Sequence, residues 1–117
     1  MSEETQSYDS DLLRGNTDAL LLALIHEHGR TYGYRLIKDI EVRSKGFFRF
    51  REGTVYPALR KLENVGLIRG EWTKLPGGQE RRYYVITDGG RAHLDERLKM
   101  WRSFAVAVDL VLRPRET

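Results

Sequence analysis

The stretch REGTVYPALRKLEN, residues 51–64, decides the interpretation of this chain. Proline is tolerated in the first turn of a helix, where its missing N–H would have no intrahelical partner. Pro57 therefore predicts a helix with its N-cap at about Gly53 or Thr54, residue types favoured at that position. Four apolar residues recur at helical spacing: Val55, Leu59, Leu62 and Val65. They predict one stripe that packs inward, and the following Gly66 predicts the end of the helix.

The opposite side of this helix, hereafter the reading helix, carries polar residues that can donate hydrogen bonds to phosphates or base edges. They are Thr54, Tyr56, Arg60, Lys61 and Asn64. Residues 43–61 also hold six basic side chains against one acid, whereas residues 1–11 hold four acids and no base. This concentration of positive charge favours a helix that contacts DNA. An ordinary surface helix with a solvated polar face is the alternative.

The composition limits the classes of protein that remain. A chain of 117 residues is one domain's length, and 40% hydrophobic with 32% charged residues is typical of a globular protein. The formal charge of +3 permits a polyanionic partner. No cysteine is present, which excludes disulfides, thiol catalysis and cysteine-based zinc sites and fits a cytoplasmic location. We expect no signal peptide and no membrane span, because the longest apolar stretch, residues 19–25, is far shorter than the ~20 residues that cross a bilayer.

The first third of the chain predicts two helices behind a tail. Residues 1–10 are polar and aperiodic, which predicts a flexible tail. The first helix is expected to begin near Asp11 or Thr17 and to run to His28. Its centre, residues 19–25, is apolar on every side, so it must be buried all round, and a second subunit could contribute to that burial.

Thr31 is the expected cap of a second helix, over residues 32–43. The linker SKGFFRFRE, residues 44–52, then leads to the reading helix. Three linker side chains are expected to anchor it on the core: Phe47, Phe48 and Phe50. Arg49 and Arg51 are expected to point outward. Three successive helices, the last with a basic face, predict a helix-turn-helix arrangement.

After Gly66 the hydrophobic period changes from helical to two. Residues 67–74 and 81–87 both alternate, and the loop LPGGQE between them is rich in turn residues, so the sequence predicts a β-hairpin. Basic residues flank its tip: Lys74, Arg81 and Arg82. A basic hairpin directly after a reading helix predicts a wing that reaches a phosphate backbone or the adjacent minor groove. A purely structural hairpin is the alternative.

The last helix is expected to be capped by Thr87 or Asp88 and to run to about Leu112, before Pro114. Its apolar residues are spaced 4-3-4-3-4, the seam of a coiled coil. They are Leu94, Leu98, Trp101, Ala105, Val108 and Leu112. Such a helix is too apolar to remain in water, which predicts a dimer contact. Packing only onto the chain's own first helix is the alternative.

Four motifs in this order and spacing resemble the PadR family of transcriptional regulators, over about residues 12–112. They are Gly33-Tyr34-x-Leu36, Gly53-Thr54-Val55-Tyr56-Pro57-Ala58-Leu59, Leu62-Glu63-x-x-Gly66-Leu67-Ile68 and Arg82-x-Tyr84-x-Ile86-Thr87-x-x-Gly90. Val55 is a conservative departure, since the family commonly has Leu there. The resemblance implies a mostly helical α+β fold, a winged helix-turn-helix with one long C-terminal dimerisation helix. The expected division is residues 11–87 for the DNA-binding domain and 88–117 for the dimerisation helix and tail.

The resemblance also implies a homodimer that binds an inverted repeat in double-stranded promoter DNA, usually as a repressor. The residues expected to contact DNA are Tyr34, Thr54, Tyr56, Pro57, Arg60, Lys61, Asn64, Lys74, Arg81 and Arg82. Known members respond to phenolic acids or planar hydrophobic drugs, and Trp101 resembles a tryptophan that stacks on such effectors. The residues expected to bind a small aromatic or drug-like effector are Trp101, Phe104 and Ala105. A large residue at this seam position is also consistent with plain dimer packing.

A protein-binding module and an enzyme are the two alternatives to a DNA-binding regulator. A winged-helix module that binds protein would tolerate loss of the basic residues, and their concentration near the reading helix argues against it. An enzyme is disfavoured because the sequence contains no nucleophile motif, P-loop or paired-carboxylate motif beside a histidine. His26 and His28 lie on different helix faces and His93 stands alone, so we expect no metal site. We expect no cofactor.

Overall fold

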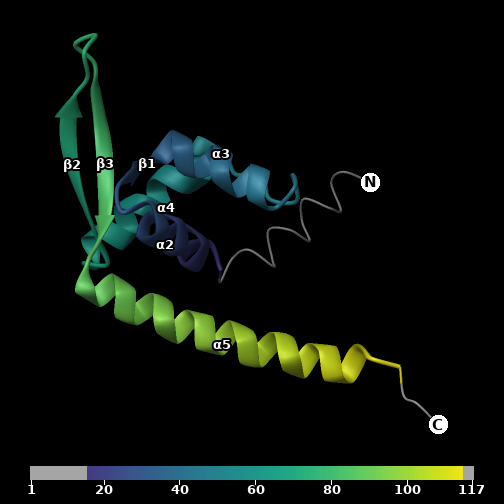
Figure 1. The fold of residues 1–117 in the computed structure, drawn as a ribbon. Helices are drawn as coiled ribbons and strands as arrows, with labels where there is room; N and C mark the ends of the chain where they lie inside the picture. The colour runs from purple at the N-terminus through teal and green to yellow at the C-terminus, as the bar shows by residue number, and fades with distance from the viewer. Residues whose placement is uncertain (1–15, 115–117) are drawn as a thin grey trace.

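Residues 16–114 are described by the computed structural model and form a mostly helical α+β fold (Figure 1). The elements in chain order are α2 (Thr17–His28), β1 (Thr31–Tyr32), α3 (Gly33–Arg43), α4 (Glu52–Asn64), β2 (Ile68–Lys74), β3 (Glu80–Ile86) and α5 (Asp88–Leu112). The predicted fold class, a winged helix-turn-helix with a long C-terminal helix, is confirmed. The tail predicted at residues 1–10 and the alternative helix start near Asp11 lie outside the described residues.

Helix α2 lies at the centre of the fold. Its apolar sequence leaves four side chains buried: Leu21, Leu22, Leu24 and Ile25. Helices α3, α4 and α5 and strand β3 all contact α2, so the chain itself covers these residues without a second subunit. Each neighbour contributes apolar side chains to the same core, among them Leu36, Leu59, Tyr84 and Leu94. The reading helix, α4, therefore buries Val55, Leu59 and Leu62 against α2 and turns its polar side to solvent.

A three-stranded antiparallel sheet of order β1-β3-β2 forms beside the helices. The predicted hairpin is confirmed, and each strand lies within one residue of its expected bounds. Strand β1 is not anticipated by the sequence, because two residues are too few to show a period. Thr31 was expected to cap α3, and this is wrong: Thr31 pairs with Tyr84 in the sheet, is fully buried, and leaves Tyr32 as the N-cap.

Helix α4 begins earlier than the proline predicts. It starts at Glu52 with Arg51 as its N-cap, so Pro57 lies in the second turn rather than the first. The Thr54 and Val55 amides donate to the Arg51 carbonyl, each over 3.0 Å, and form a complete turn ahead of the proline. Pro57 removes one helical hydrogen bond, to the carbonyl of the exposed Gly53, which water can bind instead.

The end of α4 is also shifted. Val65 was expected in the buried stripe, but it is the C-cap and is 60% exposed, because the helix ends at Asn64. Gly66 adopts φ 81° and ends the helix as predicted. The Leu67 amide then donates to the Leu62 carbonyl over 2.9 Å, which satisfies a helix-end carbonyl and directs the chain into the wing.

The linker before α4 is only partly anchored by its phenylalanines. Phe50 is buried and Phe48 packs against the core, as predicted. Phe47 is 53% exposed, contrary to the prediction, and its ring packs edge-on against Phe48 with centroids 4.9 Å apart. Arg49 and Arg51 are exposed, as expected.

Helix α5 divides into two parts. Thr87 caps it as predicted, accepting a hydrogen bond from the Gly90 amide over 3.0 Å. Leu94 is 4% exposed and Leu98 packs beside it, so the first part of the predicted dimer seam belongs to the chain's own core. The assignment of Leu94 to a dimer contact is therefore corrected. From Trp101 onward the large apolar side chains of the helix are exposed, and the yellow C-terminal part of α5 extends beyond α2 (Figure 1), so packing on α2 does not cover this part of the helix.

Gly90→Ala tests the joint between the wing and α5. A Cβ at Gly90 would overlap the carbonyl oxygen of Leu67 and lie 2.6 Å from Cγ1 of Ile86. We expect the substitution to lower the free energy of unfolding by at least about 2 kcal/mol, because a backbone group must move. Gly89→Ala is the matched control: the nearest atom to its Cβ would be 3.7 Å away, so better helix propensity should make it neutral or stabilising. Urea unfolding measures both, and equal effects would contradict this account.

Candidate nucleic-acid interface

The exposed side of α4 presents every residue that the sequence predicts for DNA contact on that helix. Thr54, Tyr56, Pro57, Arg60, Lys61 and Asn64 are all exposed. They lie opposite the buried Val55, Leu59 and Leu62, so burial of one stripe dictates the exposure of the other. The helix ends with Lys61 in its last turn, and Glu52 is the acidic residue of its first turn.

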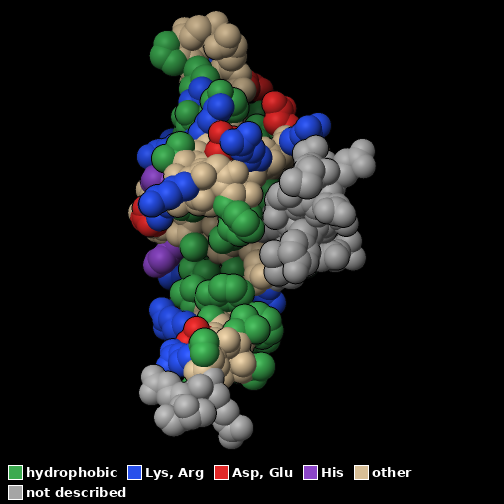
Figure 2. Space-filling view, turned by 90° about the vertical axis from the view of Figure 1, so that its right-hand side faces the viewer, with side chains coloured by type: hydrophobic (Ala, Val, Ile, Leu, Met, Phe, Trp, Pro, Cys, Tyr) green, Lys and Arg blue, Asp and Glu red, His purple; other side chains and the backbone are tan. Residues whose placement is uncertain are grey.

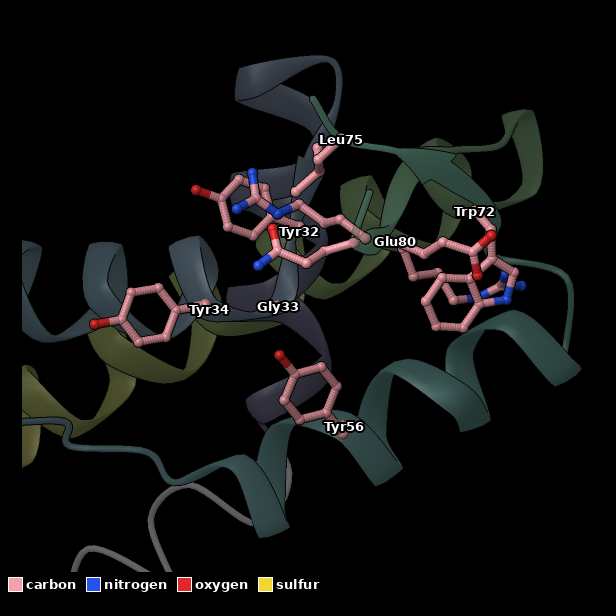
Figure 3. Close-up of a pocket in the computed structure, with 10 residues that line it drawn as sticks. Tyr32, Gly33, Tyr34, Tyr56, Trp72, Leu75 and Glu80 are labelled. Atoms are coloured by element: carbon pink, nitrogen blue, oxygen red, sulfur yellow. The ribbon is translucent and has the colours of Figure 1, made fainter. Parts of the chain in front are cut away.

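A groove of about 420 Å³ lies between the start of α3, helix α4 and the hairpin (Figure 3). Aromatic and basic side chains line most of it, together with the acidic Glu80; they are Tyr32, Tyr34, Tyr56, Trp72, Arg81 and Arg82. The hydroxyl of Tyr56 points from α4 toward Gly33 at the start of α3. Tyr34, also predicted to contact DNA, is 54% exposed at one end of the groove. The structure thus brings predicted residues from α3, α4 and the wing to one concave surface.

Gly33 explains how Tyr56 sits in this groove. A Cβ at Gly33 would lie 2.6 Å from Cε1 of Tyr56, so only glycine lets the ring rest against the start of α3. Burial raises the pKa of Tyr56, and the Glu52 carboxylate adds to this, while Arg81 opposes it. The hydroxyl therefore stays protonated at neutral pH and can donate a hydrogen bond to a phosphate oxygen.

Arg81 is held on the wing by aromatic rings. Its guanidinium carbon lies 3.9 Å from the centroid of the Tyr32 ring, and Nη1 donates to the Tyr83 hydroxyl over 3.2 Å. That hydrogen bond is the main cause that raises the pKa of Arg81, so its charge is permanent. Among residues 16–114 no acidic side chain forms an ion pair with it. Arg81 is therefore a preoriented cation with donors free for an anion.

Because side chains alternate along β3, Arg82 points to the opposite face of the sheet from Arg81, where it contacts other residues of the fold. It forms an ion pair with Glu63 of α4, both side chains being 27% exposed, and its guanidinium carbon lies 5.4 Å from the centroid of the Trp72 ring. The same Glu63 oxygen accepts a hydrogen bond from the Gly70 amide over 3.3 Å. Arg82 also lines the groove, so its contact with DNA stays a prediction, but its charge is paired with Glu63, whereas Lys74 is exposed near the tip of the wing.

The sequence analysis did not predict two residues that pack beside Arg81, of which Tyr32 lines the groove. Tyr32 supplies the ring under Arg81, and Arg30 extends the stack, its guanidinium carbon 3.7 Å from the centroid of the Tyr83 ring. Arg30 also donates to Oγ1 of Thr73 over 2.8 Å. Both missed residues belong to the turn and strand before α3, where no periodic pattern exists. The alternation of basic and aromatic residues in the hairpin could have indicated that guanidinium groups and aromatic rings stack on this sheet.

A second exposed surface lies on the outer part of α5. Hydrophobic side chains gather at the end of the molecule opposite the wing (Figure 2). Trp101 is 50% exposed, and its ring lies 5.9 Å from that of Phe104, tilted by 33°. Ala105 is half-buried beside them, and Val108 and Leu112 of the predicted seam are exposed. The predicted effector residues and the outer dimer residues therefore share one apolar surface.

Helices α2, α3 and α4 pack together, α4 exposes a basic side, and a hairpin wing follows it. This arrangement defines a winged helix-turn-helix protein. Residues 21–96 match the transcriptional regulator PadR-like family. The chain therefore belongs to the PadR-like family of transcriptional regulators, in the short form with a single C-terminal helix, as its motifs predicted.

Relatives support the assignment over nearly the whole chain. The chain is 34% identical to the transcriptional regulator Rv3488 of Mycobacterium tuberculosis over 80 residues, 67% of this chain and 71% of that one. It is 35% identical to an uncharacterized protein of Lysinibacillus sphaericus over 107 residues, 92% of this chain and 97% of the relative. The crystal structure of a PadR family transcriptional regulator from Eggerthella lenta superimposes with a TM-score of 0.81 at 29% identity, covering 97% and 96% of the two chains.

Family membership makes the protein a regulator rather than an enzyme, as predicted. Residues 16–114 contain no cluster of three or more acidic or histidine side chains that could hold a metal ion. None of the helices in that range has the length and apolarity that a membrane span requires.

Neighbouring arginines should differ in their effect on stability. Arg82→Gln leaves the partly buried Glu63 carboxylate without its cationic partner, and we expect the free energy of unfolding to fall by about 1–2 kcal/mol. Arg81→Gln removes only stacking at the surface and a bond to a hydroxyl, so its effect should be smaller. Urea unfolding of both variants tests this. An equal or larger loss for Arg81→Gln would show that the roles are reversed.

Proposed function

We propose that this PadR-like regulator is a dimeric repressor that binds an inverted repeat in promoter DNA and is released by a small aromatic effector. The observation that carries the proposal is the shared surface of α4 and the wing, where exposed polar residues flank a groove lined by Arg81, which forms no ion pair within residues 16–114. A helix of this kind fits the major groove, while a wing reaches the neighbouring backbone.

Each part of the surface has a distinct task in this proposal. Arg60, Lys61 and Asn64 face outward on α4, and Arg60 can bond a guanine edge bidentately. Tyr56 and Arg81 line the groove and bind phosphate oxygens, which fix the position of the helix without reading sequence. Phosphate contacts supply much of the affinity, so binding should weaken steeply with salt.

The dimer supplies the second half-site contact. The outer part of α5 exposes a continuous apolar surface that one chain leaves in water, and a second copy would bury it. Two reading helices of a symmetric dimer must enter major grooves ~34–36 Å apart, which makes an inverted repeat the matching operator.

The effector site is proposed on the same surface. The Trp101 and Phe104 rings are large, rigid and exposed, and a pair of each in a dimer would offer flat faces to an aromatic ligand. A ligand that favours a wider separation of the two α5 helices would move the reading helices off their spacing. It would lower DNA affinity only by as much as it prefers that dimer state. As a regulator of transcription, the protein would act in the cytoplasm.

A winged-helix module that binds protein remains the second candidate, and it differs in one respect. Binding to a protein would not need the charges of Arg60 and Arg81, whereas binding to DNA does. Arg81 is stacked on Tyr32 and, in the part of the chain that the structure describes, pairs with no acidic side chain, which favours DNA.

Binding to DNA tests the proposal directly. We expect the protein to prefer the duplex upstream of its own gene over a scrambled duplex in fluorescence anisotropy titrations, with affinity falling linearly on logarithmic axes as salt rises. Arg81→Gln should weaken binding to both duplexes and reduce the slope of log K against log[salt] by about 0.9, the loss of one phosphate contact. Arg60→Ala should instead lower the affinity ratio of the two duplexes by roughly tenfold or more.

These outcomes separate the two candidate functions. If Arg60→Ala weakened binding to both duplexes by the same factor, Arg60 would be a phosphate contact rather than a base contact. Absence of salt-dependent binding by the wild-type protein to either duplex would reject the DNA-binding proposal in favour of the protein-binding module.

A charge on the outer part of α5 tests the dimer. Val108→Asp places a carboxylate within the exposed apolar surface, and we expect it to shift the protein from dimer to monomer in sedimentation equilibrium. Ser103→Asp adds the same charge on the opposite side of the helix and should leave the dimer intact. A Val108→Asp protein that stays dimeric at micromolar concentration would place the interface elsewhere.

A further inference from the structure

We propose that Glu63 positions the wing for DNA through Arg82, so that this acidic residue strengthens binding to a polyanion. The inference rests on the proposed DNA-binding function and concerns how its two contact elements are held together. An acid close to a DNA-binding surface would ordinarily weaken binding by repulsion. The geometry of Glu63 points to the opposite effect.

Glu63 joins the reading helix to the middle of the wing. It lies on α4, two residues before the C-cap, and one of its oxygens accepts hydrogen bonds from both Arg82 on β3 and the Gly70 amide on β2. Within residues 16–114, these are the side-chain hydrogen bonds that connect α4 to the two strands of the hairpin. One carboxylate thus contacts both strands.

Gly70 makes this connection possible. In the sheet Gly70 lies opposite Tyr84, and the pair formed by Trp72 and Arg82 lies two positions further along on the same face. A Cβ at Gly70 would lie 2.7 Å from Nε and 2.9 Å from Cζ of Arg82. The guanidinium therefore passes over the bare backbone of Gly70 on its way to Glu63. Trp72 and Tyr84 flank it, with centroids 5.4 and 5.9 Å from its central carbon.

The rest of the wing is held mainly at its base. Ile68 and Tyr84 are buried in the core, whereas Trp72 and Lys74 toward the tip are exposed. The hairpin extends well beyond the helices (Figure 1), so a small rotation at its base would move its tip, and with it Lys74, away from a backbone that α4 already contacts. On the far face, Arg30 donates a hydrogen bond to Thr73 at the surface, which links the sheet to the turn before β1 rather than to α4. The angle between wing and reading helix therefore depends on Glu63.

This arrangement has an energetic consequence for binding. Two contact elements that are fixed relative to each other bind one DNA backbone without a cost for ordering them. When the link is lost, the wing rotates freely in the unbound protein and must be reordered on DNA, which takes free energy from binding, while the bound state keeps the same number of phosphate contacts. Affinity should then fall without a change in the salt dependence.

Two variants break the link in electrostatically different ways. Glu63→Gln removes a negative charge, and Gly70→Ala leaves every charge in place but fills the path of the Arg82 guanidinium. We expect each to weaken binding to the upstream duplex by roughly tenfold at fixed salt, a coupling of the size seen between directly contacting groups. The slope of log K against log[salt] should stay at the wild-type value. Glu71→Gln is the control: it removes an exposed acid on the opposite face of β2 and should bind as tightly as wild type or tighter.

Two further measurements separate wing position from general loss of fold. Unfolding free energies show whether each variant is fully folded at the assay temperature. Hydrogen exchange of the Gly70 amide should become faster in Glu63→Gln, because its acceptor is weakened. In a double-mutant cycle, Glu63→Gln with Arg82→Gln should bind no more weakly than the weaker single variant, since both act through the same link.

The outcomes are distinguishable from those of the proposed function. If wild type shows salt-dependent DNA binding while folded Glu63→Gln and Gly70→Ala bind as tightly as wild type or tighter, in line with Glu71→Gln, the inference is overturned and DNA binding stands. A lower salt slope in Glu63→Gln would also overturn it, because phosphate contacts would then have been lost. If wild type itself shows no salt-dependent binding, the proposed function fails and the inference fails with it.

Discussion

Burial of α2 is the constraint on which the other elements depend. Its centre is apolar on every side, and Leu21, Leu22 and Ile25 are fully buried. A single helix of this kind is stable in water only if other elements surround it, and α3, α4, β3 and α5 each cover part of it. Because α4 must turn Leu59 and Leu62 toward α2, its polar side is fixed outward. The orientation of the proposed DNA-contact surface thus follows from the packing of the core.

Close approaches at glycines then set the positions of the elements on that core. Gly33 lets the Tyr56 ring lie against α3, Gly70 lets the Arg82 guanidinium cross the sheet, and Gly90 lets α5 start against the Leu67 carbonyl. None of these three needs an unusual backbone angle; each is a place where a side chain would separate two elements. Small residues at element junctions therefore define the relative placement of helix, wing and C-terminal helix, while the large apolar residues supply the stabilising free energy.

The features that the sequence predicted are those that depend on neighbours in the chain. The stripe of Val55, Leu59 and Leu62, the stop at Gly66 and the Thr87 cap all rest on local spacing or backbone geometry. What it did not predict depends on partners distant in sequence. Strand β1 exists because β3 offers a free edge, and Arg82 pairs with Glu63, a residue 19 positions away in the chain. Hydrophobic period alone also could not divide the α5 seam, since Leu94 and Trp101 fit the same pattern while only the first meets the core.

Thr87 joins the two proposed functional surfaces. The Thr87 hydroxyl donates to the Gly66 carbonyl over 2.7 Å and accepts from the Gly90 amide over 3.0 Å, so one side chain bonds the end of α4 and the start of α5. The Thr87 amide also donates to the Leu67 carbonyl over 3.1 Å. A change in the angle between two α5 helices of a dimer would therefore reach the reading helix through a short hydrogen-bonded joint rather than through a flexible linker. Such a joint allows one helix to serve both association and control of DNA spacing, provided that an effector binds two dimer states with different affinity.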